Sequence, residues 1–596
     1  MKSKRPKRKV DLHESRVSGN EWLIVSIVLS LVVVLFTAIP IFKNPQLEPD
    51  DYRYLENVQH LKEDFWGKIL DASVVENHWD HLWWIDIHQK VRFFRPTVVL
   101  SYWTDVLLYG KSPLGGLLLT NFLIYSACVV VACIILFHWI GPGLSFLIAS
   151  ILFASFYSHG EVMWYVAGRT DSLASLFFLL GLCLHVYGDR RSSFRWFAVP
   201  CFLLAILTKE LTAILPVILF FIDVAVEKRG SSIRDVLKKE WRLYSSYSII
   251  IAVVSAIRAA IVAGPETGYP YPYFILPGDP HFLRHFWGQI NAYCDNLFLA
   301  IETPPVKDPT PTPLISAGLA IGVILLAILT YVLSRQMKYW VLMALAIGSW
   351  LPTITVYISE RYLFLPSFAL AGAIGLLLVH LSGGRSKNLH YAATFVALVW
   401  AVHQAFSLNL KHQAFTVPPR PPQAMGRQLT KSAISIPRGG KILMVNLPGD
   451  WLQSQFLEYQ MRVQLDDPLL EVTTLTTMPR TSDMGANLSI KRTGDRSLRI
   501  ESLNQSPVMA RGDEQAPWVS LETGSNYADV SGMKISVING RLSEATALQF
   551  NLPEDLGRYT IMKWTADPHR VWTGDAHGLL ATYYRALHST VQRISP

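Results

Sequence analysis

Charged residues are scarce in this chain. Only 17% of its 596 residues are Asp, Glu, Lys or Arg, whereas 51% are hydrophobic and the mean hydropathy is +0.27. Soluble globular proteins carry about 25% charged residues, so this composition excludes an ordinary soluble protein and predicts a polytopic α-helical membrane protein. The net charge of +9 does not indicate a nucleic-acid partner, because much of it lies in short basic segments between apolar runs.

Cysteine is also scarce, with five residues in the chain and none beyond Cys294. The other four lie in apolar segments: Cys128, Cys133, Cys183 and Cys201. Their spacing predicts neither a disulfide framework nor a cysteine zinc site. His78, Asp80, His81 and His88 could bind zinc, although we favour a solvated or interfacial histidine cluster. We therefore expect no required cofactor and leave the question of a metal open.

Long apolar runs are abundant. A membrane span needs about 20 apolar residues. The sequence predicts eleven spans, of which the third and fifth are short. They cover residues 22–42, 114–138, 143–158, 171–188, 194–208, 211–226, 243–263, 313–333, 339–357, 362–381 and 389–408.

Basic residues indicate the orientation of these spans, because Lys and Arg gather on the cytoplasmic side of a membrane. They occupy the N-terminus and every second loop, except one uncharged turn at 140–142. The basic segments hold Lys2, Lys4, Arg5, Lys7, Arg8, Lys9 and Arg16; Arg190, Arg191 and Arg195; Lys228, Arg229, Arg234, Lys238, Lys239 and Arg242; Arg335 and Lys338; and Arg385 and Lys387. We expect a cytoplasmic N-terminus and a C-terminal region on the outer side. The first span lacks a small-residue cleavage site after it, so we expect it to be retained.

The chain divides into four predicted parts. They are a basic tail (1–21), a transmembrane domain (22–410) with a first outer loop at 43–113, a Pro-rich linker (411–425) and an outer β-rich α+β domain (426–596). In the first outer loop, apolar residues recur at helical spacing from Leu55 to Ile69, and Phe93–Leu108 is typical of an interfacial helix. The β-rich part contains five predicted strands: Lys441–Asn446, Leu470–Thr476, Leu488–Arg492, Ser497–Ile500 and Met533–Ile538.

Two adjacent carboxylates, Asp50 and Asp51, follow the first span closely. Anchoring a helix in a membrane does not require them. One interpretation is an N-terminal helix cap, because Asp is favoured at that position. The other is a general base for an acceptor hydroxyl at the outer edge of the membrane. Both interpretations remain open, and one Asp could cap the helix while the other faces the reactants.

Further charged residues lie at the same predicted edge of the membrane. Ionisable groups at membrane depth are costly and usually functional. Snorkelling, capping or structural ion pairing would explain each of them singly, but a shared side fits a site for an anionic lipid phosphate. We expect Arg169 and Lys209 either to line that site or to brace it. The cations are Arg95, Arg169, Lys209, Arg258 and Arg361, and the acids beside them are Asp171, Glu210 and Glu360.

Five short motifs carry a family resemblance in order, spacing and sidedness over about residues 20–410. They are Asp50-Asp51, Phe94-Arg95-Pro96, Gly168-Arg169-x-Asp171, Lys209-Glu210 before an apolar run ending at Asp223, and Glu360-Arg361-Tyr362-Leu363-x-Leu365-Pro366-Ser367. The chain resembles the membrane-embedded C-type glycosyltransferases that use polyprenyl-phosphate sugars. More narrowly, it is similar to relatives of the protein O-mannosyltransferases and of the tetratricopeptide-containing O-mannosyltransferases. It departs from the latter because no 34-residue repeat is present, and Asp51 stands where many relatives have Glu.

The resemblance implies a C-type fold and an inverting transfer of a sugar to an acceptor hydroxyl on the outer face. Asp50 would act as general base beside Asp51, and the cations above would hold the leaving polyprenyl phosphate. Neither a general acid nor a metal is required. The acceptor would be a protein, a glycan or a lipid, in a bacterial inner membrane or, alternatively, the endoplasmic reticulum. A transporter or flippase of lipid-linked substrates and a non-catalytic scaffold remain alternatives.

Overall fold

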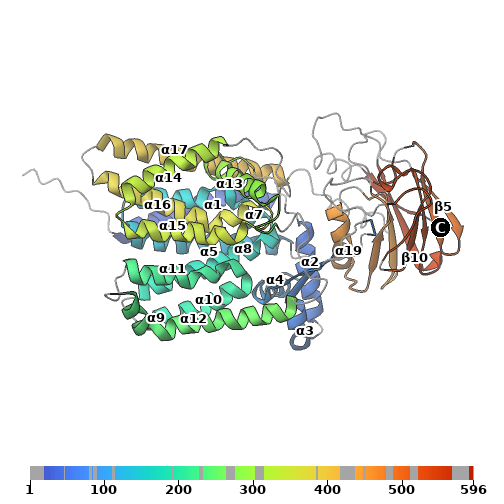
Figure 1. The fold of residues 1–596 in the computed structure, drawn as a ribbon, viewed down its shortest axis with the longest axis horizontal. Coiled ribbons are helices and arrows are strands. Elements are labelled where there is room, and N and C mark those ends of the chain that lie inside the picture. The colour runs from blue at the N-terminus through green and yellow to red at the C-terminus, as the bar shows by residue number, and fades with distance from the viewer. Residues whose placement is uncertain are drawn as a thin grey trace, which may run out of the picture.

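The structure is a computed structural model, and it shows a helical bundle with a sheet-containing region beside one end of it (Figure 1). It describes residues 19–43, 45, 47–62, 64–78, 83–84, 90–110, 114–188, 192–226, 232–262, 275–302, 315–383, 387–416, 436–447, 451–477, 488–505, 507–509, 521–529, 531–566 and 589–594.

Every predicted apolar segment contains a helix of the bundle. These helices are α1 (Gly19–Lys43), α5 (Leu114–Ile140), α6 (Leu144–Ser155), α8 (Arg169–Tyr187), α10 (Ala198–Thr208), α11 (Leu215–Phe221), α12 (Ile233–Val262), α14 (Ala317–Leu333), α15 (Met337–Trp350), α16 (Phe364–Ser382) and α17 (Lys387–Thr416). Among the described residues, six helices are long and apolar enough to cross a membrane alone, and a seventh span forms if the bent pair of α6 and the helical turns at 157–164 counts as one. The chain is therefore a polytopic helical membrane protein, and the number of eleven spans stays a prediction.

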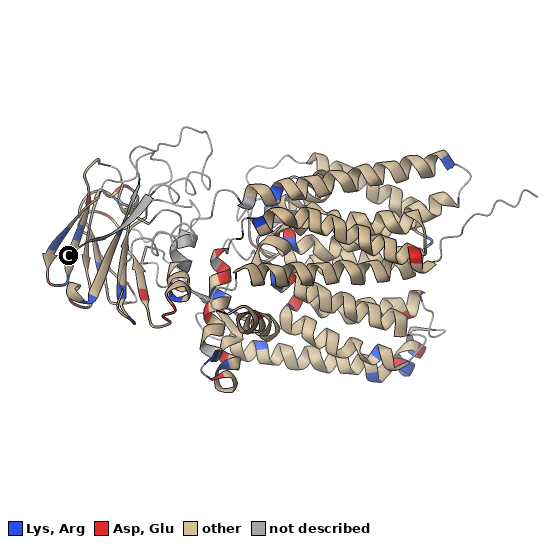
Figure 2. Cartoon of the chain, turned by 180° about the vertical axis from the view of Figure 1, so that it is seen from behind, with Lys and Arg blue, Asp and Glu red and all other residues tan. Residues whose placement is uncertain are grey.

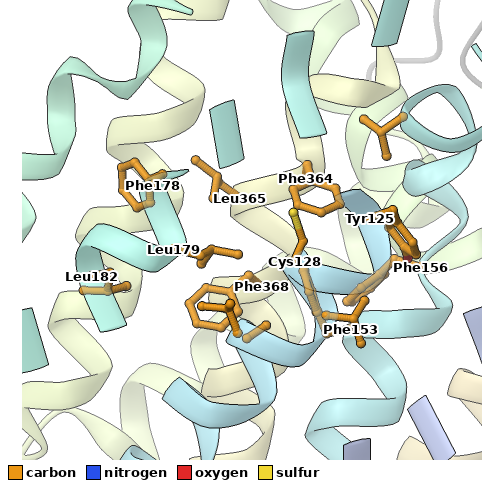
Figure 3. Close-up of a cluster of buried hydrophobic side chains, with 14 of the residues drawn as sticks. Tyr125, Cys128, Phe153, Phe156, Phe178, Leu179, Leu182, Phe364, Leu365 and Phe368 are labelled. Carbon is orange, nitrogen blue, oxygen red and sulfur yellow. The ribbon is translucent and has the colours of Figure 1, made fainter. Parts of the chain in front are cut away.

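The core of the bundle lies where α5, α6, α8 and α16 meet. Aromatic and aliphatic side chains from these helices interlock there, among them Phe153, Phe178 and Phe368, and all three are fully buried (Figure 3). Close approach of α16 depends on a small residue. A Cβ at Gly375 would lie 2.3 Å from Ile140 Cδ1 and 3.0 Å from the Ala149 Cβ, so a larger residue would require these neighbours to move. Small residues at helix contacts are typical of packing in membranes.

Short elements cover the end of the bundle that faces the sheet region. They are α2 (Pro49–Gln59), α3 (Phe65–Ala72), α4 (Pro96–Tyr109), α13 (Phe282–Leu299) and the antiparallel pair β1 (Val74–His78) and β2 (Lys90–Phe94). The predicted helix at 55–69 is thus two helices, because Asp64 caps a new one by accepting a hydrogen bond from the Gly67 N–H at 2.9 Å. The predicted helix at 93–108 is observed as α4. The basic start of α12 and α9 (Ser192–Trp196) lie at the opposite end (Figure 2).

The described residues of the C-terminal region form two sheets and one α-helix. A four-stranded sheet has the order β11 (Ser589–Ile594), β10 (Tyr559–Ala566), β3 (Lys441–Val445), β4 (Glu471–Thr474), with α19 (Trp451–Leu465) connecting the parallel strands β3 and β4. A five-stranded antiparallel sheet has the order β5 (Leu488–Gly494), β6 (Ser497–Ser502), β9 (Ala547–Asn551), β8 (Lys534–Val537), β7 (Asn526–Ala528). All five predicted strands are observed, whereas α19, β7, β9, β10 and β11 had no predicted counterpart.

Candidate functional site

Asp51 is fully buried and holds backbone groups on two sides. Its Oδ2 accepts a hydrogen bond from the Glu48 N–H at 2.7 Å, which completes the cap of α2. Its Oδ1 accepts from the Ala167 N–H at 2.6 Å, in the short helical turn that precedes α8. Burial raises the pKa of Asp51 well above its ordinary value. Asp51 thus ties the start of α2 to the segment before α8.

Asp50 is only partly buried and points to the same segment. Its Oδ2 accepts a hydrogen bond from the Tyr165 hydroxyl. Its Oδ1 receives no hydrogen bond from any residue that the structure describes. One carboxylate of the pair is therefore committed to the backbone, and the other keeps an oxygen available to a substrate hydroxyl.

Arg361 and Lys209 share one carboxylate next to Tyr165. The Arg361 guanidinium lies 5.5 Å from the centre of the Tyr165 ring, and its Nε lies 3.7 Å from Asp171 Oδ2. The Lys209 ammonium donates to the other oxygen of Asp171 and lies 4.6 Å from the Tyr362 ring. These two cations thus share one carboxylate close to Asp50, and the Glu161 carboxylate also accepts from the Arg361 backbone N–H at 3.4 Å.

Glu360 anchors the turn that carries Arg361. Its carboxylate is buried and accepts from the Glu161 N–H at 3.1 Å, from Asn296 Nδ2 at 3.2 Å and from the Lys411 ammonium. Lys411 reaches this point from α17, so the final helix of the bundle fixes the loop before α16. Glu360 therefore supports Arg361 and does not face the acidic pair.

A second basic group lies farther along α2. Tyr54, one turn after Asp50, accepts a hydrogen bond from Arg95 Nη1 at 3.1 Å. Arg258 on α12 lies 3.5 Å from the Glu210 carboxylate and donates to a backbone carbonyl of α10 at 2.6 Å. The side chain of Glu210 is 51% exposed, so this ion pair is loose. Arg258 thus lies at the end of α10, where Lys209 directly precedes Glu210, and the charge of Arg95 also acts on Glu210.

Arg169 pairs with a different carboxylate from these cations. Its Nη1 lies 2.6 Å from Asp105 Oδ2, and its Nε and Nη2 donate to Asn121 Oδ1 and the Leu117 carbonyl at 2.7 and 2.9 Å. The side chain is fully buried, and its guanidinium lies 4.6 Å from the ring of Tyr102. Of the two roles expected for Arg169, these contacts correspond to bracing α8 against α4 and α5.

Several residues of the site gave no signal of their own in the sequence. Tyr165 lies three residues before the Gly168-Arg169 motif, so proximity to that motif was the available clue. Glu161 and Lys411 come from an apolar turn and from the last helix, where nothing marked them.

Within the described part of the chain, no group of three or more His, Cys, Asp or Glu residues is arranged to hold a metal. The suggested ligands Asp80, His81 and His88, and the side chain of His78, lie outside the described residues.

No protein-family model and no curated protein matches the chain. Among solved structures, it is similar to the oligosaccharyltransferase of Archaeoglobus fulgidus tethered to an acceptor peptide, with 12% identity, a TM-score of 0.42 and 76% of this chain covered. The chain spans 64% of that protein's length. It is also similar to ArnT from Cupriavidus metallidurans bound to undecaprenyl phosphate, with 14% identity, a TM-score of 0.36 and coverage of 78% of this chain and 87% of ArnT. At these TM-scores the similarity establishes neither a family nor an activity of this chain.

Proposed function

We propose that this protein is a membrane glycosyltransferase that moves a sugar from a polyprenyl-phosphate donor to an acceptor hydroxyl. The observation that carries the proposal is the position of Asp50. Its carboxylate accepts a hydrogen bond from Tyr165, whose ring lies 5.5 Å from the Arg361 guanidinium, and Arg361 shares the carboxylate of Asp171 with Lys209. A general base next to a phosphate-binding group is what such a transfer requires.

Two lines of support are independent of one another. The first is geometric, since α2, the segment before α8, the end of α10 and the turn before α16 come together from distant parts of the sequence. The second is the resemblance of the five motifs, which contribute Asp50, Arg95, Asp171, Lys209 and Arg361 to this region.

The reaction follows from these positions. Asp50 Oδ1 accepts the proton of the acceptor hydroxyl while that oxygen attacks the anomeric carbon of the donor. The bond from the anomeric carbon to the phosphate oxygen breaks, and the polyprenyl phosphate leaves with the electron pair. Arg361, Lys209 and Arg258 stabilise the leaving phosphate through charge-assisted hydrogen bonds. Attack opposite to the leaving group inverts the anomeric centre.

Tyr165 orients the base in this scheme. Its hydroxyl donates to Asp50 Oδ2, so the carboxylate presents Oδ1 to the reactants. Asp51 has a positioning role, because it holds the Ala167 N–H and with it the segment that carries Tyr165. The acceptor is a protein, a glycan or a lipid, and an outer-facing site with a cytoplasmic N-terminus agrees with the charge distribution along the sequence.

The test uses the purified full-length protein in nanodiscs. A panel of donors is supplied, namely undecaprenyl-phosphate glucose, undecaprenyl-phosphate mannose and dolichyl-phosphate mannose, and released polyprenyl phosphate is measured by mass spectrometry. We expect release from at least one donor, and its loss in Asp50→Asn but not in Asp71→Asn, which changes an exposed Asp of the same loop. Equal release by the two variants would contradict the role of Asp50. In proteoliposomes, movement of the donor across the membrane without release would instead indicate a flippase.

A further inference from the structure

The two faces of α2 contact different parts of the molecule. Asp50 and Tyr54 are one turn apart and reach the bundle. Tyr52 and Glu56, also one turn apart, lie on the opposite side. Both are nearly completely buried, although they belong to an outer loop. The helix that carries the proposed base is therefore covered from behind.

The covering element is α19 of the C-terminal region (Figure 1). Glu56 Oε1 lies 2.7 Å from Arg462 Nη1, and the Tyr52 hydroxyl accepts from Gln464 Nε2 at 3.3 Å. The Arg53 guanidinium lies 4.3 Å from the centre of the Tyr459 ring. These contacts combine an ion pair, a hydrogen bond and a cation–π contact within two turns of each helix.

Arg462 joins three elements through one side chain. Besides Glu56, its guanidinium lies 2.5 Å from Glu458 on its own helix and donates to the Leu470 carbonyl at 2.7 Å, just before β4. A planar guanidinium can serve these partners at fixed directions, whereas an ammonium would serve them poorly. The guanidinium of Arg462 thus connects α2 to the four-stranded sheet.

Each part also buries side chains of the other. Tyr459 belongs to the hydrophobic cluster of the bundle, and Val463, one turn later, packs against that cluster. In return, Trp83 and Trp84 from the first outer loop are buried in the hydrophobic cluster of the C-terminal sheets. The Trp83 indole donates to the Leu475 carbonyl at 3.2 Å. An exchange of this kind fixes the relative position of two parts more firmly than a surface contact does.

We propose that the C-terminal region is a positioning part of the active site, and that Arg462 and Tyr459 on α19 hold α2 so that Asp50 stays in reach of the acceptor hydroxyl. The expected effect of α19 on turnover rests on the proposed function, whereas its effect on the position of α2 does not. A misplacement of a reacting group by about 1 Å lowers a rate by about a hundredfold. A loss of support behind α2 should therefore reduce the rate and leave lipid-phosphate binding intact, because the proposed phosphate ligands come from other elements.

The first experiment measures amide hydrogen exchange in residues 49–62. In Arg462→Ala we expect exchange about tenfold faster than in the wild type, as expected for a segment that opens more easily. Arg496→Ala is the matched control, because Arg496 pairs with Asp555 in an exposed ion pair of the same region. Wild-type protection of α2 in a folded Arg462→Ala protein would overturn the proposal.

The second experiment separates turnover from binding. We expect Arg462→Ala to lower donor turnover about tenfold without changing the Kd for undecaprenyl phosphate, and Arg462→Lys to recover part of the rate. If Arg462→Ala does not fold, Tyr459→Leu with Tyr459→Phe replaces it, since only Phe keeps the ring that Arg53 contacts. Faster exchange in α2 with normal turnover would also overturn the positioning role. A wild type without turnover on any donor would contradict the proposed function, whereas the exchange measurement would still decide the coupling.

Discussion

The helical bundle carries a group of buried charges at each end, and the two groups differ in how completely they are matched. At the end remote from the C-terminal region, Asp223 in the helical turn after α11 accepts from His185, Arg195 and Tyr244 at 2.9, 2.5 and 2.6 Å. Arg195 also lies 2.9 Å from Glu240. The side chains of His185, Asp223 and Arg195 are at most 6% exposed.

The group around Asp50 is looser. The Arg258–Glu210 and Arg361–Asp171 pairs are 3.5 and 3.7 Å long, and Glu210 is half exposed. The same residue types therefore serve two purposes. Around Asp223, where one carboxylate accepts from three side chains at 2.9 Å or less, the cluster holds helices together. Around Asp50, where the ion pairs of Arg258 and Arg361 are 3.5 Å or longer, an anionic ligand could replace these contacts.

Neutralising Asp50 has the largest expected effect and tests most directly how the two charge groups differ. We expect Asp50→Asn to lower donor turnover by about a thousandfold, because an amide cannot accept the acceptor's proton. Thermal stability and the Kd for undecaprenyl phosphate should stay at the wild-type value, since Asp50 is partly exposed. Turnover is measured as release of polyprenyl phosphate in nanodiscs. Near-normal turnover would leave the acidic pair with a capping role only.

The same substitution at Asp223 should have the opposite profile. Asp223→Asn removes the charge that pairs with Arg195, and breaking a buried ion pair costs about 3–5 kcal/mol. We expect a large fall in the unfolding temperature of the detergent-solubilised protein. This temperature is measured by differential scanning fluorimetry. Any correctly folded fraction should turn over donor at the normal specific rate. A stable variant with lost turnover would place Asp223 in the chemistry and refute the contrast.

Arg258 tests whether the loose cations bind phosphate. A charge-assisted hydrogen bond contributes about 1.5–3 kcal/mol, so Arg258→Ala should weaken undecaprenyl phosphate binding by about ten- to a hundredfold. Arg258→Lys should recover part of the affinity, because lysine lacks the bidentate fork. Native mass spectrometry of the protein with the lipid gives the Kd. Arg335→Ala, at an exposed position between α14 and α15, is the control; equal affinities in the two alanine variants would exclude Arg258 from the site.

Asp51 should behave as a structural member of the acidic pair. In Asp51→Asn one of the two backbone N–H groups loses its acceptor, at a cost of about 1–3 kcal/mol. Burial raises the pKa of Asp51, so the folded protein binds this proton more tightly than the unfolded chain. Its contribution is present at low pH and is lost as pH rises through the folded-state pKa. The stability difference between wild type and variant should therefore shrink as pH rises, and a difference that grows with pH would contradict the assignment.

Glu210 should give the smallest effect. If Arg258 binds phosphate as proposed, the Glu210 carboxylate would compete with the phosphate for it, and exposed pairs contribute about 0.2–1 kcal/mol. Glu210→Gln should therefore tighten undecaprenyl phosphate binding by up to about fivefold. Glu21→Gln, at the start of α1, is the control. Weaker binding in Glu210→Gln would mean that Glu210 positions Arg258 and does not compete with the lipid.

The sequence alone determined the polytopic helical part, α4 and five strands of the C-terminal region. Those features follow from local periodicity and hydropathy, which depend on neighbouring residues only. It did not indicate β10, whose parallel partner β3 lies more than a hundred residues away, because the pairing depends on contacts that local sequence does not encode. Nor did it indicate that Trp83 and Trp84 belong to the core of a region that starts hundreds of residues later.

The candidate site divides in the same way. Sequence reasoning selected Asp50, Arg361 and Lys209, since charged residues at a membrane edge are conspicuous in an apolar chain. Tertiary structure alone decided which member of the acidic pair is committed to backbone N–H groups, that Arg169 turns toward Asp105, and that α19 supports α2 from behind. Residue type and spacing limit which groups can be charged and on which segment they lie. The direction in which a buried charge turns depends on which donors and acceptors the folded chain brings within hydrogen-bonding distance.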